Sequence, residues 1–279
     1  MLNRRTLLTG MTAAPLASPT CACVTAPAPA GSGATLTLAT FNIWHNQGDW
    51  PARLPLIVEV LRAQDADVIA LEEVLQDAAV GLPNQAQTLA EALGYQWIFH
   101  SVDDEARPRR YGNAILTRLP IIASDWKKLE PLDDYRTAIR LRVAKGGAPI
   151  DLVVTHLAWQ DDAGPVRARQ IGDLLAWLPQ DGTPLVVMGD FNATQEDSGL
   201  AVLTGPDYFS ALPRGSVATT LKPAKGHPNR VIDHIFARAD AFAPVSARAF
   251  ATQSVGGEYA SDHFGVSATI RLRQGQARR

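Results

Sequence analysis

The stretch that most constrains this chain is Pro184–Thr194, PLVVMGDFNAT. The apolar residues 185–188 predict a buried strand, and Gly189 at its end permits a sharp turn. Asp190 and Asn192 follow two positions apart, so both side chains can face the same way. A carboxylate beside a carboxamide suits a site that holds a hard cation together with an anionic oxygen. An Asx-rich turn after a strand is the alternative interpretation.

Polar residues also end most of the other predicted strands. Short apolar runs and alternating patterns predict strands over residues 35–43, 67–71, 95–100, 112–117, 135–143, 150–154 and 231–236, with a last strand after residue 263. Helical periodicity predicts helices over residues 54–61, 84–93 and 164–178. The polar residues at or beside the strand ends are Asn42, Glu73, His156, Asp190, Asn192, Asp233, Asp262 and His263. Strand ends gather at one edge of an open α/β sheet, so we expect these side chains to form one site.

Several polar residues also have a simpler structural interpretation. Asn42 by itself predicts a strand-end cap, and His156 by itself predicts a buried structural histidine. Glu72 and Glu73 follow a buried strand, and a buried carboxylate is costly unless it is paired or bound to a metal. Adjacent residues of a regular strand face opposite sides, so only one of these two acids is expected in a shared site. Arg136 opens a later strand and reaches either a phosphate or the solvent.

Composition and charge bound the class of protein. The 279 residues are 46% hydrophobic and 19% charged, which suits one large α/β domain over residues 31–279. The formal net charge of −2 excludes a basic field that would coat nucleic acid, but it leaves room for a local basic cleft. Arg107, Arg109 and Arg110 form either part of a solvated loop or such a basic rim.

Residues 1–30 have the layout of an export signal. Arg4 and Arg5 stand directly before a modest apolar stretch at 7–17, and small residues and prolines follow. This arrangement resembles a twin-arginine signal, and a disordered basic N-terminus is the alternative. We therefore expect an exported protein, periplasmic or secreted, whose leader is removed near Ala30.

Both cysteines, Cys21 and Cys23, lie in this leader. The residues before each cysteine do not form a convincing lipobox, so the sequence gives little support for a lipid anchor through either one. The remaining chain has no thiol, so neither a disulfide nor thiol catalysis is expected there. It also has no apolar run long enough to cross a bilayer, and we expect a monomer.

Seven motifs in a fixed order carry a family resemblance: FN at 41–42, LEEV at 71–74, GNAILTR at 112–118, THL at 155–157, GDFNA at 189–193, IDHIF at 232–236 and SDH at 261–263. In this order they resemble the endonuclease/exonuclease/phosphatase superfamily, which includes deoxyribonuclease I, over residues 35–272. The resemblance implies a deoxyribonuclease I-like α/β (α+β) four-layer sandwich, with two packed mixed sheets flanked by helices. One departure is Glu72, where many relatives carry Gln.

The resemblance also implies a metal-binding side of the site. Glu73, with Asn42 nearby, would bind a divalent cation, with Mg²⁺ expected first and Mn²⁺ or Ca²⁺ as alternatives. Oxygen-rich ligands without thiolate agree with that choice. Asp262 would support the metal side, and Arg136 and Asn113 are the candidates for substrate binding.

The remaining motif residues would perform phosphate ester hydrolysis. Asp190 and Asn192 would orient the attacking water and hold a phosphate oxygen. His263 would be the general base, positioned by Asp233, and His156 would contact the phosphate or assist the leaving group. Such hydrolysis needs neutralised charge on the non-bridging oxygens and an activated, in-line water, and these residue types can supply both.

The resemblance indicates the reaction better than the substrate. A secreted endonuclease on DNA or RNA agrees with the arginines at 107–110, whereas the acidic charge after removal of the leader opposes it. A sphingomyelinase- or phospholipase C-like phosphodiesterase would use Trp44, Trp50, Trp126 and Trp159 around a pocket or on a lipid surface. The third reading is a non-catalytic binding module on the same scaffold, which the retained acid, amide and histidine set argues against.

Overall fold

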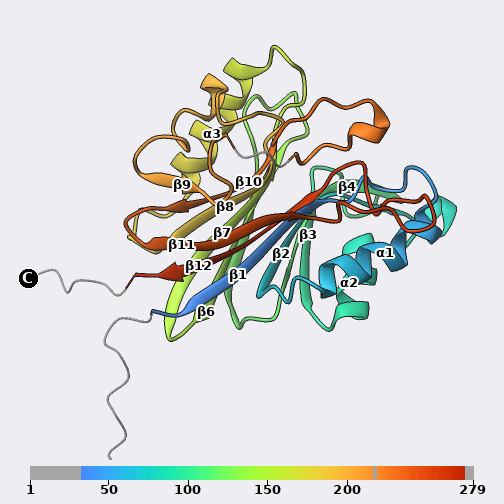
Figure 1. The fold of residues 1–279 in the computed structure, drawn as a ribbon, viewed down its shortest axis with the longest axis horizontal. Helices are drawn as coiled ribbons and strands as arrows, with labels where there is room; N and C mark the ends of the chain where they lie inside the picture. The colour runs from blue at the N-terminus through green and yellow to red at the C-terminus, as the bar shows by residue number, and fades with distance from the viewer. Residues whose placement is uncertain (1–32, 216–218, 274–279) are drawn as a thin grey trace, which may run out of the picture. The chain divides into compact units, whose positions relative to one another are not determined.

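Two mixed six-stranded sheets form the centre of the protein (Figure 1). The computed structural model describes residues 33–215 and 219–273. The first sheet has the order β11 (Phe242–Phe250), β12 (Gly265–Leu272), β1 (Thr35–Asn42), β2 (Val68–Asp77), β4 (Arg109–Thr117), β3 (Gln96–Ser101). The second has the order β5 (Ile121–Lys128), β6 (Thr137–Lys145), β7 (Ala148–His156), β8 (Leu185–Asp190), β10 (Asp233–Arg238), β9 (Tyr208–Ser210). β1 and β2 run parallel, as do β7 and β8, and the other neighbours are antiparallel.

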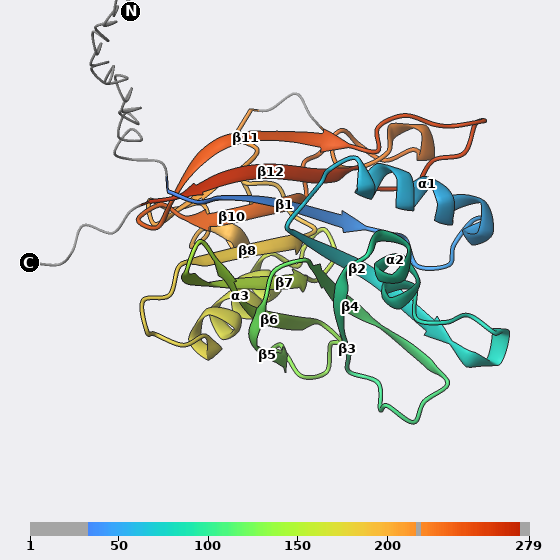
Figure 2. The ribbon, with the colours of Figure 1, turned by 90° about the horizontal axis from the view of Figure 1, so that it is seen from below.

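Helices cover the outer faces of both sheets (Figures 1 and 2). α1 (Trp50–Arg62) and α2 (Gln85–Leu93) pack on the first sheet through one apolar cluster, and α3 (Gly164–Trp177) packs on the second through another. A third cluster joins the inner faces of the sheets, with alternate residues of β1, β6, β7 and β8 buried in it. The result is the four-layer α/β sandwich that the motifs predict. Three short 3₁₀ helices, η1 (Ala78–Val80), η2 (Ser198–Leu200) and η3 (Pro223–Lys225), lie in the connections.

The predicted elements are present, and their ends differ where a cap or a pairing strand was not visible in the pattern. α1 begins at Trp50, earlier than predicted, because Asp49 accepts a hydrogen bond from Ala52 N and Pro51 occupies the first turn. α2 is capped at its start by Asn84, and Gly94, whose φ is 77°, follows its last residue, Leu93. β5, β9 and β11 were not predicted, because no residue of β5 or β9 and only the two end residues of β11 are buried, so none of them shows a buried apolar run.

The expected leader, with its arginine pair and both cysteines, lies outside the described residues. Within residues 33–215 and 219–273 there is no helix with the length and hydropathy of a membrane span.

Candidate active site

The polar residues meet where several strands end, on one edge shared by both sheets. His156 and Asp190 are register partners at the ends of parallel β7 and β8. Asp233, the first residue of antiparallel β10, pairs with Asp190 from the other side. Asn42 ends β1 of the first sheet, and its amide nitrogen donates to Asp190 Oδ2 across the sandwich at 3.0 Å. The sequence expectation of one shared edge therefore agrees with the geometry.

Asp190 is the centre of this arrangement, and Gly189 is required to place it. Gly189 has a φ of 141°, and a Cβ there would overlap the Thr155 carbonyl oxygen of β7. Asp190 is buried, and its Oδ1 accepts from the backbone N–H of Asn192 at 2.9 Å. Burial opposes ionisation of Asp190, but nearby imidazoles and the Asn42 amide hold the pKa of this carboxyl below its ordinary value.

Asp233 and His263 form a buried dyad. His263 Nδ1 lies 2.9 Å from Asp233 Oδ2, and its Nε2 lies 3.8 Å from Asp190 Oδ2. Burial opposes the charged imidazole, but the carboxylates of Asp233 and Asp190 outweigh it and raise the pKa of His263 well above its usual value. The dyad therefore orients the ring and stabilises its protonated form.

His156 also approaches Asp190, with Nε2 at 3.5 Å from Asp190 Oδ2. Burial, and next the positive charge of Arg136, lower the pKa of His156 to about 3, so this imidazole is neutral. Arg136 is buried, with its guanidinium 4.6 Å from the Tyr135 ring centroid, and its Nε has no hydrogen-bond partner among the described residues. The sequence pattern left Arg136 either at a phosphate or in the solvent, and this burial rules out the solvent-exposed position.

Glu72 and Glu73 both face the site, which corrects the expectation that only one of them could. The strand does not end at residue 71, and the pairing of β2 with β4 shifts between Leu71 and Val74. Glu73 takes a φ of 57° within this bulge. Glu73 Oε1 accepts a hydrogen bond from the Asn42 side chain at 3.2 Å. Glu72 Oε1 accepts one at 2.9 Å from Thr40, which lies two residues before Asn42 on β1. The irregular backbone removes the alternation on which the expectation relied.

The other predicted residues lie around this centre. Asn113 of β4 donates across the sandwich to Thr137 Oγ1 at 3.1 Å, at the start of β6. Asn192 donates through its side chain to the Leu157 carbonyl at 3.1 Å. Asp262 lies beside His263 in sequence, and its Oδ2 is 3.7 Å from His227 Nε2.

Three further residues contribute to the site, although no role was assigned to them from the sequence. Thr220 Oγ1 accepts from the backbone N–H of Ile232 and of Asp233, and so fixes the start of β10. Ser261 Oγ donates to the Asn42 carbonyl at 2.7 Å and ties the segment of His263 to β1. Tyr111 is partly buried near Glu73, and loss of solvent around its hydroxyl, followed by the charge of Glu73, raises the pKa of that hydroxyl. Tyr111 directly precedes the GNAILTR motif and Ser261 lies inside SDH, whereas nothing in the sequence marks Thr220.

Four carboxylates make up what we call the acidic centre: Glu72, Glu73, Asp190 and Asp233. Within the described residues, their ion-pair partners are the imidazoles of His45, His156 and His263, and none is a lysine or an arginine. Burying several of these carboxylates in their charged forms is unfavourable without a compensating cation. Carboxylate oxygens suit a hard divalent ion, so the acidic centre fits one.

Two sets of residues are candidates for holding that ion. Asp190, Asp233 and His263 each offer an atom within 4.8 Å of the others. The short hydrogen bond between Asp233 and His263 occupies that pair. Glu73 and Asp190, which converge on the Asn42 amide, are therefore the better-placed oxygen donors.

The expected basic rim at 107–110 is largely engaged in structure. Arg109 and Arg110 belong to β4 and not to a loop. Arg109 lies 3.7 Å from Asp77, and the guanidinium of Arg110 lies 5.2 Å from the Phe99 ring centroid. Arg109 and Arg110 therefore contact neighbouring strands of the first sheet, and Arg107 remains an exposed residue before β4.

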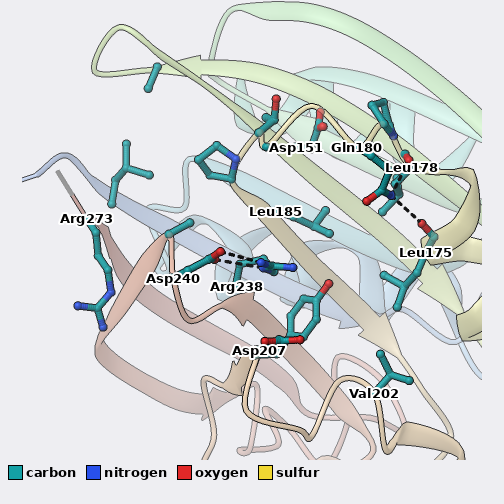
Figure 3. Close-up of a pocket in the computed structure, with 18 residues that line it drawn as sticks. Asp151, Leu175, Leu178, Gln180, Leu185, Val202, Asp207, Arg238, Asp240 and Arg273 are labelled. Carbon is teal, nitrogen blue, oxygen red and sulfur yellow. Dashed lines mark hydrogen bonds and ion pairs between the residues drawn. The ribbon is translucent and has the colours of Figure 1, made fainter. Parts of the chain in front are cut away.

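A pocket of about 1160 Å³ lies at the opposite ends of the strands (Figure 3). Its lining includes Ala148 and Leu185, the first residues of β7 and β8, and Arg238, the last of β10. Arg238 and Asp240 in this pocket form an ion pair at 2.6 Å. The pocket is therefore separate from the acidic centre.

A four-layer sandwich with carboxylates, amides and a histidine dyad at one edge of both sheets defines a class of phosphoester hydrolase. The chain belongs to the endonuclease/exonuclease/phosphatase family, whose model matches residues 39–263. A comparison with curated protein sequences found no match.

Solved structures share the fold at low sequence identity. The human nocturnin catalytic domain with bound sulfate has a TM-score of 0.70 and 22% identity, covering 86% of this chain and 94% of that one. A family member from Bacteroides thetaiotaomicron has a TM-score of 0.71 and 19% identity, covering 87% and 99%. D. rerio TDP2, complexed with a single-strand DNA product, has a TM-score of 0.69 and 19% identity, covering 85% and 98%.

Proposed function

We propose that this protein is a divalent-metal-dependent phosphodiesterase that cleaves with a histidine-activated water. The observation that carries the proposal is the Asp190 carboxylate, which is within 4 Å of both His263 and His156 and bonded to Asn42. Family membership supports hydrolysis of phosphate esters. The sulfate bound to the nocturnin domain and the DNA product in TDP2 are consistent with anionic ester ligands on this fold.

Glu73 and Asp190, with Asn42 between them and Asp262 on the outer side, would hold the cation, for which we expect Mg²⁺, with Mn²⁺ or Ca²⁺ as alternatives. When bound, such an ion neutralises charge on the phosphate oxygens and favours attack by water.

The remaining residues have distinct tasks in the proposed reaction. In its neutral form, His263 would take a proton from the attacking water at Nε2, because Nδ1 is held by Asp233. The carboxylates that raise the pKa of His263 stabilise the imidazolium that results. Asp190 and Asn192 orient the water and a phosphate oxygen. Neutral His156 and the guanidinium of Arg136 would donate to the phosphate, with Asn113 at the substrate side.

The test is hydrolysis of bis-p-nitrophenyl phosphate by the purified chain in Mg²⁺ and in EDTA. We expect metal-dependent turnover, and a fall in kcat of about 10²- to 10⁴-fold in His263→Gln and in Asp190→Asn. Arg271→Met is a suitable control, because Arg271 is exposed near the far end of β12. Turnover retained in both site variants would contradict the assignment.

A phospholipid or other small ester is the second candidate substrate. Trp159, three residues after His156, is 63% exposed, and Leu132 is 56% exposed. Exposed apolar side chains of this kind suit contact with a lipid surface. Metal-dependent release of phosphocholine from sphingomyelin vesicles, without nicking of plasmid DNA, would favour this candidate.

We further propose that the protein is exported, on the strength of the leader at residues 1–30, and that it acts as a monomer. Mass spectrometry and size-exclusion chromatography of the secreted or periplasmic protein test both points. A mass that retains the leader or a lipid on Cys21 or Cys23 would contradict simple cleavage.

A further inference from the structure

A turn formed by residues 219–227, here called the lysine turn, lies directly along the segment that carries His263. Lys222 N donates to the Asp262 carbonyl at 3.0 Å, and Phe264 N donates to the Thr220 carbonyl at 2.8 Å. Between these bonds, Leu221 and His263 form an isolated antiparallel bridge. The turn contains η3, orange in Figures 1 and 2, at the end toward which the β1 arrow points. The backbone pairing places the turn at the rim of the acidic centre.

The turn carries two lysines whose ammonium groups rest on aromatic rings. Lys222 Nζ lies 3.5 Å from the Tyr259 ring centroid, and Lys225 Nζ lies 4.8 Å from that of Trp44. Trp44 is anchored to the site, because its backbone N–H donates to Asn42 Oδ1 at 2.9 Å. Lys222 is 5% exposed, whereas Lys225 is exposed. Cation–π contacts of this kind hold a lysine in place and leave its N–H donors free for an anion.

These two lysines lack acidic partners. In the part of the chain that the structure describes, neither forms an ion pair, whereas Lys127 pairs with Asp173 and Lys145 with Asp67. The nearby carboxylate of Asp262 faces His227 instead. Unpaired positive charge beside an acidic catalytic centre favours a second anionic group on the substrate.

A third cation contacts the same aromatic residue as Lys225. Arg53 is fully buried, and its guanidinium lies 5.2 Å from the Trp44 ring centroid, so that Trp44 contacts both Arg53 and Lys225. The ring faces that would bind a quaternary ammonium are thus occupied by cations of the protein. A choline headgroup would be disfavoured here, and a phosphate favoured.

We propose that Lys222 and Lys225 form a second phosphate-binding site, which takes the phosphate next to the scissile one in a nucleic-acid strand. This inference rests on the proposed phosphodiesterase activity and names its substrate class. The scissile phosphate lies at Asp190 and His263, and the neighbouring phosphate of the same strand reaches the lysine turn. The two lysines give local affinity for a polyanion to a protein whose overall charge is negative.

The experiment compares two substrates over a range of salt. Lys225→Met, Lys222→Met and the control Arg271→Met are assayed on a single-stranded oligonucleotide and on bis-p-nitrophenyl phosphate, which has one phosphate. For each lysine variant we expect kcat/KM to fall at least about fivefold more on the oligonucleotide than on the small ester. The slope of log(kcat/KM) against log[salt] for the oligonucleotide should become shallower by roughly 0.7 per lysine. The control should match the unaltered protein on both substrates.

The outcomes separate this inference from the proposed activity. Unaltered protein that hydrolyses neither substrate would overturn the phosphodiesterase assignment itself. Metal-dependent hydrolysis of the small ester, combined with an unchanged oligonucleotide salt slope in Lys225→Met, would overturn only the second phosphate site. Because Lys222 is buried, its variant is used only if its thermal unfolding matches that of the unaltered protein. Lys225 is exposed, so the result for Lys225→Met is sufficient to test the second phosphate site.

Discussion

At the scale of single residues, Glu72 is the most unusual group in the site. Its side chain is fully buried, and Oε1 accepts from Thr40, while Oε2 has no hydrogen-bond partner among the described residues. Burial, and next the charges of Asp233 and Asp190, raise the pKa of Glu72 well above its ordinary value of 4.5. Glu72 is therefore held as a neutral acid in the metal-free protein, where its shape is close to that of glutamine.

Replacing Glu72 by Gln should stabilise the metal-free protein at neutral and alkaline pH. A carboxyl whose pKa is raised by folding gives its full stability below pH 4.5 and loses it as the pH rises toward the folded pKa. Glu72→Gln removes that loss, so we expect the free energy of unfolding at pH 8 to increase by about 1–3 kcal/mol, with little change at pH 4.5. Urea denaturation in EDTA at both pH values measures this.

The control for Glu72 is Glu91→Gln, an exposed acid on α2. Glu91→Gln should give the same pH dependence of the free energy of unfolding as the unaltered protein. Parallel pH curves for Glu72→Gln and the unaltered protein would show that Glu72 is ionised to the same extent in both folded and unfolded chains.

At the scale of elements, α1 supports the site through one buried arginine. Arg53 donates to the carbonyls of Ile43 and Ala260 at 2.8 Å each, and to those of Gln47, Trp44 and His45. Ile43 follows Asn42 directly, and Ala260 precedes the SDH segment. One guanidinium thus fixes the loop after β1 and the approach to His263 together.

Arg53→Met should destabilise the fold by about 3 kcal/mol or more, because several buried carbonyls lose their donor at once. Arg62→Met, on the same helix, removes a single bond to the Ala92 carbonyl at an exposed position and should change stability by less than about 1 kcal/mol. Urea denaturation of both variants measures the difference. Equal losses in the two would contradict the role assigned to Arg53.

At the scale of the whole molecule, the acidic centre joins the two sheets. Asn42 and Glu73 come from the first sheet and Asp190 from the second, and the Asn42 amide donates to both carboxylates. A cation bound between these side chains would bind the folded chain and not the unfolded one. Binding should therefore increase the stability of the sandwich as a unit.

We expect Mg²⁺ or Mn²⁺ to raise the thermal midpoint in a concentration-dependent way, corresponding to about 2.7 kcal/mol at a hundredfold excess over Kd. Glu73→Gln should remove most of this shift. Differential scanning calorimetry with and without EDTA measures it independently of turnover. A shift of equal size in Glu73→Gln would place the ion elsewhere.

Much of this site was predictable because its residues follow short-range patterns. Gly189 to Asn192 after a buried strand, and His156 and Asp233 at neighbouring strand ends, indicated one edge before any pairing was known. The local pattern failed where the backbone is irregular, as at the bulge that turns both Glu72 and Glu73 toward β1. It also failed for β11, whose exposed face carries no apolar run.

The sequence by itself determined the family, the strands and the residue types that the chemistry needs, because apolar runs, turns and motifs are local properties of the chain. Only the tertiary structure decided which side chains meet. Asn42 and Asp190 are 148 residues apart and belong to different sheets, and Arg136 is buried beside His156 although its strand pattern permits exposure. Such contacts depend on how two sheets pack and on where one strand bulges, and these are set by the summed packing of the whole core.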